Sequence, residues 1–247
     1  TAVGSVAATD PDQNAPNNTL LFEIIGGNHA GGFAIDATSG QLSVQNPAAL
    51  DFETTPTFSL DVRVSDAATP SLSDTANITV NLADINDSAP QIDLNGLDES
   101  GSNFATSFDQ APVLIVETDA TVTDLDGLGT GPIATLTVTI SNVIDTGSEL
   151  LSADVSGTSL SAGYDPNSGT LVLSGPAPAL EFEQVLRTVT YENTSPSRSP
   201  GERIIEIVAN DGANSSAVAS STVGVSAANA SPVATDDVYE TAFETPL

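Results

Sequence analysis

The chain of 247 residues contains an internal repeat, and this repeat limits its possible folds more than any other feature. A turn of the form D-x-x-S-G-x-L is followed by A-L-[DE]-F-E, and the same order returns later in the chain. A D-x-D turn precedes each copy, and a strand-like segment ending in Asp follows it. The paired segments are 10–12 with 124–126, 36–42 with 165–171, 49–53 with 179–183 and 64–66 with 209–211. Self-similarity of this kind predicts two homologous units, the second carrying insertions.

Apolar residues alternate with polar ones in short segments of both units. The alternating positions are Phe58, Leu60, Val62 and Val64; Ile78, Val80 and Leu82; Leu136, Val138 and Ile140; Leu171 and Leu173; and Val223 and Val225. A period of two in segments rich in Thr, Ser and Val indicates strands with one buried face. Turn residues recur about every eight to twelve positions, which is typical of a β-sandwich. The predicted fold class is therefore all-β.

One segment departs from this alternation and predicts a single short helix in the second unit. Phe182, Val185, Leu186 and Val189 follow the i, i+3, i+4, i+7 spacing of one helical face. Pro178 stands just before them, where a proline near the first helical position is favourable.

These patterns give a division into three parts: a sandwich over 1–89, a second sandwich over 90–230, and a strand within 231–247. The last part restarts the pattern that follows Pro90, whereas the first unit lacks a leading strand of its own. We interpret the chain as a piece of a longer, secreted or surface-displayed polypeptide. The C-terminal strand either begins a further unit or, as a donor strand, completes the first unit of another molecule.

Charge and composition exclude several classes of function. The formal net charge is −29, with 33 acidic residues and only four basic ones. Such a surface repels nucleic-acid backbones and anionic lipid, so binding to either is not expected. The chain has no cysteine and no apolar run long enough to span a membrane. The expected ligand of so acidic a protein is a cation.

The acids concentrate at positions that a sandwich would bring to its poles. Asp51 and Glu53 follow one strand, and Asp84, Asn86 and Asp87 follow another. The corresponding acids of the second unit are Asp124, Asp126 and Asp211. Calcium prefers six to eight oxygen ligands of these types. Without a cation the carboxylates would repel one another, so the sequence predicts a calcium site at the junction of the two units.

The first unit resembles the cadherin repeat, and five motifs in the family's order carry the resemblance. These are ATDPD (8–12), FAIDATSGQL (33–42), LDFE (50–53), the strand ending at Asp66 and DINDSAP (84–90). The resemblance implies tandem Greek-key sandwiches of the cadherin or immunoglobulin-like type, cell adhesion and interdomain Ca²⁺. It also implies that neighbouring repeats are partners.

Carried over residue by residue, the resemblance assigns further ligands. The carbonyls of Ile85 and Ser88 join the acids of the first junction. Asp10, Asp12 and Asp66 form a second site whose missing ligands come from a preceding unit. The second junction, SAANASP (226–232), lacks both Asp residues of DINDSAP. We expect weak calcium binding and more bending there.

The second unit resembles the cadherin-related repeats of very large bacterial surface proteins. The segments that carry this resemblance are 112–127, 180–195 and 207–212. It implies an adhesin-type host protein and places Asp109 where that family has an ion-bridging acid.

Alternative interpretations remain open. DINDSAP alone is equally compatible with a solvated Asx turn. A Thr-rich strand over 134–141 keeps a glycan- or surface-binding module in consideration, although the sequence has no Trp. The D-T-G-S segment at 145–148 lacks the second D-T-G of an aspartic protease, so a loop is expected. His29 lies in a glycine-rich loop with no nucleophile nearby. No enzyme is predicted.

Overall fold

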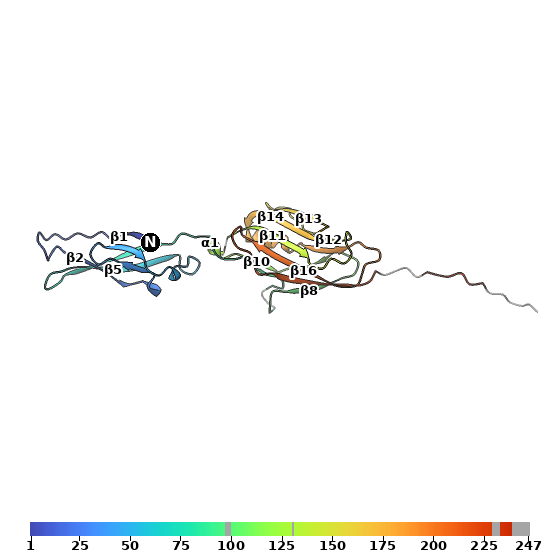
Figure 1. Cartoon of the computed structure of the whole chain (residues 1–247), viewed down its shortest axis with the longest axis horizontal. Helices are drawn as coiled ribbons and strands as arrows, with labels where there is room; N and C mark the ends of the chain where they lie inside the picture. The colour runs from blue at the N-terminus through green and yellow to red at the C-terminus, as the bar shows by residue number, and fades with distance from the viewer. Residues whose placement is uncertain (97–99, 130, 229–232, 239–247) are drawn as a thin grey trace, which may run out of the picture. The chain divides into compact units, whose positions relative to one another are not determined.

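The computed structural model describes residues 1–96, 100–129, 131–228 and 233–238. Its contacts divide the chain into two compact units. Unit 1 comprises Thr1–Gln91, Thr123–Ala134 and Asn210–Ser216. Unit 2 comprises Ile92–Val122, Thr135–Ala209 and the residues from Ala217 onwards. Figure 1 labels several strands of each unit, such as β2 and β5 in unit 1 and β14 and β16 in unit 2.

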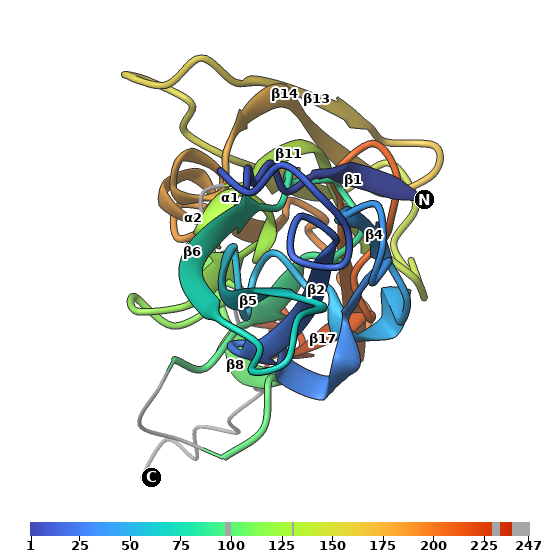
Figure 2. The same cartoon turned by 90° about the vertical axis from the view of Figure 1, so that its left-hand side faces the viewer.

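Unit 1 contains two three-stranded sheets around one core. Its elements are β1 (Ala2–Ser5), β2 (Leu20–Gly26), the 3-10 turn His29–Gly31, β3 (Phe33–Ile35), β4 (Gln41–Val44), the 3-10 turn Pro47–Ala49, β5 (Thr57–Asp66), β6 (Ser73–Asn81) and the short helix α1 (Asp126–Gly129). One sheet has the order β1-β4-β3 and the other β2-β5-β6, all neighbours being antiparallel. Figure 2 shows β2, β5 and β6 side by side.

The alternation in β5 shows how the sequence builds this sandwich. Phe58, Leu60 and Val62 are buried, whereas the intervening Ser59 and Asp61 are exposed. The buried side chains pack in one core with partners from the other sheet, chiefly Phe33 and Leu42. Phe33 and Phe58 meet edge to face, with ring centroids 5.1 Å apart. The strands predicted around these residues are therefore confirmed.

Unit 2 holds a larger sheet and a smaller one. The remaining elements of the chain are β7 (Gln91–Asp93), β8 (Phe104–Phe108), β9 (Val113–Leu114), β10 (Thr121–Thr123), β11 (Pro132–Ile140), β12 (Glu149–Ser152), β13 (Ser161–Asp165), β14 (Thr170–Pro178), α2 (Ala179–Leu186), β15 (Thr190–Asn193), β16 (Gly201–Asn210) and β17 (Ala219–Val225). The large sheet has the order β13-β14-β11-β16-β17-β8, and the small one β12-β15-β9. The β7 and β10 strands pair with each other.

The predicted helix is present as α2, and Phe182, Val185 and Leu186 are its buried residues. Pro178 precedes the first helical residue and does not occupy it, because its ψ of 146° is extended. Val189 lies beyond the helix end, where its backbone N–H donates to the carbonyl of Leu186. The apolar spacing therefore predicted the helix but extended one turn too far.

The boundaries predicted at residues 89 and 230 remain predictions. In the C-terminal part, residues 233–238 form no strand, and the rest of the predicted strand lies outside the described residues. In the described portion of the chain, no helix combines the length and apolar character needed to cross a bilayer. The all-β class with short helical segments is confirmed.

Candidate metal centre

Three buried aspartates of unit 1 converge on one point. Asp124, Asp126 and Asp211 each place a carboxylate oxygen within 4.8 Å of the others. Their exposed fractions are only 1%, 3% and 7%. Carboxylates that are this close together and this well shielded from water repel one another strongly unless a cation or a proton lies among them.

A second group shares one of these residues. Oxygens of Glu53, Asp87 and Asp126 also lie within 4.8 Å of one another. Asp126 thus belongs to both groups. The sequence predicted all five of these acids as ligands, and the structure brings them together in unit 1.

Backbone N–H groups hold one oxygen of each buried aspartate in place. The Asp126 N–H donates to Asp124 Oδ1 over 3.1 Å, and the Ser88 N–H donates to Asp126 Oδ1 over 3.1 Å. Asp211 Oδ1 accepts from two N–H groups of the following turn, each at 2.6 Å. These bonds fix the carboxylates and leave their second oxygens available.

Those second oxygens are buried without a hydrogen-bond partner in the part of the chain that the structure describes. They are Oδ2 of Asp124, Asp126 and Asp211, together with Oε1 of Glu53. A buried polar atom without a partner costs about 1–3 kcal/mol, and more when it is charged. The four orphaned oxygens therefore fit a bound cation, which would supply the interaction that the protein does not.

The electrostatics of the site lead to the same conclusion. Burial raises the pKa of Asp124; the N–H of Asp126 opposes this rise, and the charges of Asp126 and Asp211 add to it. At Glu53 a backbone hydrogen bond lowers the pKa, but desolvation and the charges of Asp87, Asp51 and Asp84 together raise it. A cation would reverse both shifts by favouring the ionised forms.

Other predicted ligands lie beside these groups and have partners of their own. Asp51 accepts from the N–H and the hydroxyl of Thr54, at 3.0 and 2.9 Å. These two hydrogen bonds lower the pKa of Asp51, and the bond from the hydroxyl has the larger effect. Asp84 Oδ2 accepts from the Gly127 N–H over 2.9 Å, and the Asn86 amide donates to the Asp211 carbonyl over 3.5 Å. Asp51 and Asp84 thus lie beside the site without joining either acidic group, and Asn86 is bonded to the turn that carries Asp211.

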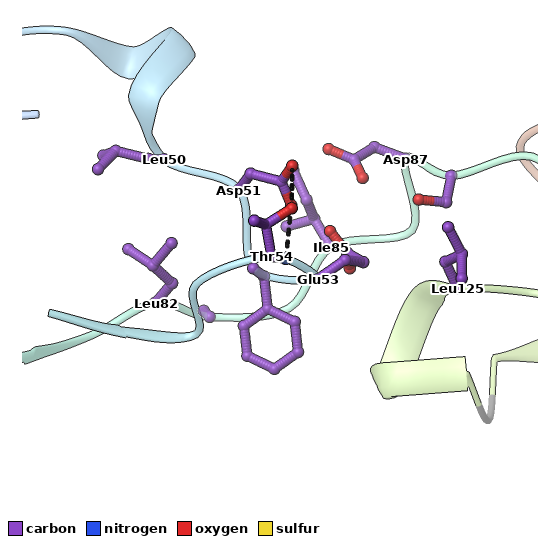
Figure 3. A pocket seen from close by; sticks show the side chains of 11 residues that line it. Leu50, Asp51, Glu53, Thr54, Leu82, Ile85, Asp87 and Leu125 are labelled. Carbon is purple, nitrogen blue, oxygen red and sulfur yellow. Dashed lines mark hydrogen bonds between the residues drawn. The ribbon is translucent and has the colours of Figure 1, made fainter. Parts of the chain in front are cut away.

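An open pocket leads to Glu53 and Asp87. Ile85, Ser88 and Leu125 contribute to its lining. Figure 3 shows Asp51 beside Thr54, with the hydrogen bonds between them dashed, and Asp87 on another segment. Every candidate ligand here is an oxygen atom, and many are carboxylate oxygens. This donor set fits a hard divalent cation that accepts many oxygen ligands, and calcium meets that description better than magnesium.

The second predicted site has a looser arrangement. Asp10, Asp12 and Asp66 line one groove of unit 1, joined by Asp74, which the sequence reasoning missed. Asp10 Oδ1 accepts from the Asp12 N–H, and Asp66 Oδ1 accepts from the Leu72 N–H. Within the described ranges, these acids do not form a group of three within 4.8 Å.

Asp109 lies in unit 2, where a basic side chain and a hydroxyl contact its carboxylate. Arg198 forms an ion pair with it at 3.6 Å, and the Ser226 hydroxyl donates to the same carboxylate over 3.1 Å. It is not among the acids that converge in unit 1. The ion-bridging role that the resemblance gives to Asp109 remains a prediction.

Two supporting residues could have been found in the sequence. Thr54 stands three residues after Asp51, the spacing at which a side-chain carboxylate accepts from a following N–H. Gly131 follows the D-x-D turn, and a Cβ there would lie 2.9 Å from the Asp124 carboxylate. Glycine is therefore required beside the buried acids.

The D-T-G-S segment proves to be more than an unanchored loop. Asp145 forms an ion pair with the buried Arg203 at 3.1 Å, and Glu149 pairs with the same guanidinium. The Tyr191 hydroxyl donates to Glu149 over 2.8 Å. Asp145, the acid of the D-T-G-S segment, is thus part of an ionic network around the buried Arg203.

His29 belongs to a 3-10 turn, and its ring lies near that of Phe58.

The comparisons with known proteins find similarity to one family in the first part of the chain. Residues 1–83 match the family described as Cadherin domain. Domains of this class are extracellular adhesive modules, typically calcium-dependent, and they are not enzymes. The matched residues include all the first-unit motifs except DINDSAP, which begins at residue 84.

Individual relatives are similar over a limited region. The protocadherin-like wing polarity protein stan of Drosophila melanogaster is 39% identical over 98 residues, which is 40% of this chain and 3% of that protein. Protocadherin Fat 2 of Rattus norvegicus is 31% identical over 129 residues, 52% of this chain and 3% of that protein. The chain thus spans only a few per cent of the length of the curated relatives that it matches.

A solved structure supports the fold over most of the chain. The crystal structure of mouse cadherin-23 EC22-24 matches with a TM-score of 0.52 and 18% identity, covering 91% of this chain and 59% of that one. At this identity the match shows the fold alone. It confirms the predicted tandem β-sandwich class.

Proposed function

We propose that the chain is a calcium-braced repeat module of an extracellular adhesive or surface protein. The observation that carries this proposal is the set of four buried carboxylate oxygens around the shared Asp126 that have no hydrogen-bond partner among the described residues. A bound cation would relieve both their charge and their lack of hydrogen bonds.

The chain's residues divide the work of holding the ions. Asp124, Asp126 and Asp211 would hold one cation, and Glu53, Asp87 and Asp126 a second. The carbonyls of Ile85 and Ser88, the Asn86 amide, and Asp51 and Asp84 are the further oxygens that the cadherin resemblance supplies. Bound calcium contributes positive charge that turns mutual repulsion into attraction.

The mechanical consequence concerns the segment that joins consecutive repeats. A cation held by residues of 84–88 and by the turns at 124–126 and 211 ties these segments together. We propose that this stiffens an extended extracellular rod. Neighbouring repeats of the same protein would be the immediate partners, and a cell-surface or matrix ligand would bind elsewhere on the rod. The bacterial adhesin context belongs to this proposal as well.

Calcium titration tests the proposal with a matched pair of variants. Asp126→Asn removes the shared carboxylate, whereas Glu206→Gln makes the same change at an exposed position of β16. Isothermal titration should detect calcium binding in the wild type and in the Glu206→Gln variant, with at least a ~10-fold loss of affinity, or about 1.4 kcal/mol, in the Asp126→Asn variant. Equal affinities in all three proteins would refute the site.

A second candidate function is a filament subunit that assembles by donor-strand exchange. The observation that favours it is the position of β6, an edge strand of unit 1 that pairs only with β5 in the described part of the chain. Glycan binding has less support, because the Thr-rich strand β11 lies inside the six-stranded sheet between β14 and β16.

A further inference from the structure

The second linker, SAANASP (226–232), begins at a residue that is bonded to the end of a neighbouring strand. Strand β17 ends at Val225 and pairs there with Phe108, the last residue of β8. The N–H of the next residue, Ser226, donates to the Phe108 carbonyl over 3.2 Å, and its hydroxyl donates to the Asp109 carboxylate over 3.1 Å. The first residue of the linker is therefore fixed to unit 2 by its own hydrogen bonds.

One arginine contacts all of these groups. Arg198 lies in the loop between β15 and β16, and its Nε donates to the Ser226 carbonyl over 3.0 Å. Its Nη2 donates to the Asp109 carbonyl and pairs with the Asp109 carboxylate at 3.6 Å. The guanidinium carbon lies over the Phe108 ring, 5.2 Å from its centroid, which is a cation–π distance. A single planar cation thus joins the end of β8 to the start of the linker.

The bonds to backbone carbonyls dominate this arrangement. The Arg198 side chain is 8% exposed, whereas that of Asp109 is 74% exposed. An ion pair with so exposed a carboxylate contributes little, because water screens it. Hydrogen bonds from a buried charged donor to a carbonyl are among the stronger ones. Loss of the guanidinium should therefore loosen the linker more than loss of the Asp109 carboxylate.

The loop that carries Arg198 is itself held on both sides. The N–H of the next residue, Ser199, donates to Asp145 over 3.0 Å, and the Ser199 carbonyl accepts from Arg203 over 2.9 Å. Arg203 in turn pairs with Asp145. The buried ionic network around Arg203 therefore fixes the backbone next to Arg198, so that its guanidinium is positioned before it meets the linker.

Unit 1 is built differently beside its linker. It contains one arginine, Arg63, which pairs with Glu23 across β5 and β2. The linker residue Asp87 instead belongs to the acidic group with Glu53 and Asp126. The first linker thus meets carboxylates, whereas the second meets a guanidinium.

The other three arginines all lie in unit 2, and each pairs with acids there. Arg198 and Arg203 form the contacts described above, and Arg187 pairs with Glu183 at 2.8 Å. The internal repeat aligns Glu183 with Glu53, whose Oε1 is buried without a hydrogen-bond partner among the described residues. An acid that lacks a partner in unit 1 has an arginine as its counterpart's partner in unit 2.

We infer that Arg198 is a built-in cation that anchors the start of the second linker, Ser226, to the end of β8 without calcium. It gives Asp109 a guanidinium as its cation, in place of the metal ion that the resemblance predicts there. The chain then has one linker that responds to calcium and one whose first residue is fixed in calcium and in chelator alike. The inference concerns unit 2 and stands whether or not unit 1 binds calcium.

Amide hydrogen exchange of Ser226 in the full chain, followed by NMR, tests the inference. In the wild type the exchange rate should agree within about twofold between calcium and chelator. Arg198→Met keeps an apolar side chain over Phe108 but removes the charge and the donors, and it should speed the exchange by about tenfold or more. Arg63→Met makes the same change at an exposed ion pair and should exchange like the wild type. An unchanged rate in Arg198→Met would overturn the inference.

A metal ion at Asp109 is the alternative, and the same measurement detects it. If calcium slows the exchange of Ser226 in the wild type by about tenfold, a metal ion anchors the linker and the inference is wrong. Calcium titration reports on unit 1 separately. Its failure would refute the proposed calcium site and leave the arginine anchor in place.

Two milder variants keep the test decisive if Arg198→Met lowers the melting temperature of the whole chain. Asp109→Asn removes the exposed charge but leaves both carbonyl contacts, so exchange at Ser226 should rise by less than about threefold. Arg198→Lys keeps the charge and loses the planar fork of donors, so its effect should be clearly larger. An effect of Asp109→Asn equal to or greater than that of Arg198→Lys would show that the carboxylate, and not the guanidinium, anchors the linker.

Discussion

At the scale of single residues, the chain uses its few cations and many carboxylates in two opposite ways. In unit 2, the buried Arg203 compensates Glu149 and Asp145, and the hydroxyl of Tyr191 completes the network. In unit 1, Asp124, Asp126 and Asp211 are equally buried and have no basic partner among the described residues. A buried carboxylate in this chain is thus either paired with an arginine or left without a basic partner, where it can bind a cation.

Removing the arginine of the network around Arg203 should lower the free energy of unfolding substantially. Arg203→Met leaves two buried carboxylates without their partner, and breaking a buried pair in this way costs about 3–5 kcal/mol of unfolding free energy. Arg63→Met is the control, because Arg63 and Glu23 form an exposed pair expected to contribute about 1 kcal/mol or less. Denaturant unfolding measures both. Similar losses in the two variants would show that Arg203 has no special role.

The raised pKa values of Asp124 and Glu53 predict opposite pH responses with and without calcium. A carboxyl whose pKa is raised in the folded state binds its proton more tightly there, so stability falls as pH rises through the folded pKa. Without metal, lowering the pH from neutrality into the range where these two carboxyls take up their protons should therefore raise the melting temperature. With calcium, protons compete with the ion and the melting temperature should fall.

Calorimetric scans in chelator and in calcium check this crossed response. Acids with lowered pKa values, such as Asp51, which is bonded by the Thr54 hydroxyl, lose their contribution only below about pH 4 and do not disturb this window. Parallel slopes in the two buffers would contradict the prediction.

At the scale of elements, short turns hold the candidate ligands in place. The backbone N–H groups of Asp126 and Ser88 orient the carboxylates, and Gly131 gives Asp124 the space that it occupies. The strands bring the turns together, but the turns decide which oxygen is left free.

Gly131→Ala should therefore weaken calcium binding. The added Cβ would lie 2.9 Å from the Asp124 carboxylate and 3.0 Å from the Asp126 carbonyl, so one of them must move. We expect a loss of affinity of about tenfold, equivalent to about 1.4 kcal/mol. Gly163→Ala in β13 is the control, because a Cβ there has no atom within 4 Å. Calcium titration of both variants gives the comparison, and equal affinity would argue against tight packing at the site.

At the scale of the whole molecule, the two linker sequences should respond differently to calcium. The first, DINDSAP, contributes Asp87 to an acidic group, whereas SAANASP at 226–232 has no acid. Limited proteolysis should cut near residue 87 only after chelation. Cleavage within 226–232 should be the same with and without calcium. Calcium protection of both linkers, or of neither, would show that the acids of the first linker do not brace it.

The sequence by itself determined the β-sandwich class, the helix near Phe182 and the acids that converge. These follow from local periodicity and from the repeat, which align residue types without knowledge of their neighbours. The convergence of Asp87 and Asp126 in one acidic group was predictable because oxygen-rich turns at strand ends meet at the poles of a sandwich.

Only the tertiary structure decided what each acid meets. Asp109 pairs with Arg198, and Asp145 with Arg203, through segments far apart in the sequence. Asp51 and Asp84 are bonded by local or backbone donors, whereas the second oxygens of Asp124, Asp126 and Asp211 have none among the described residues. Whether a carboxylate is free to bind a cation depends on burial and on its nearest donor, and both are properties of the packed chain.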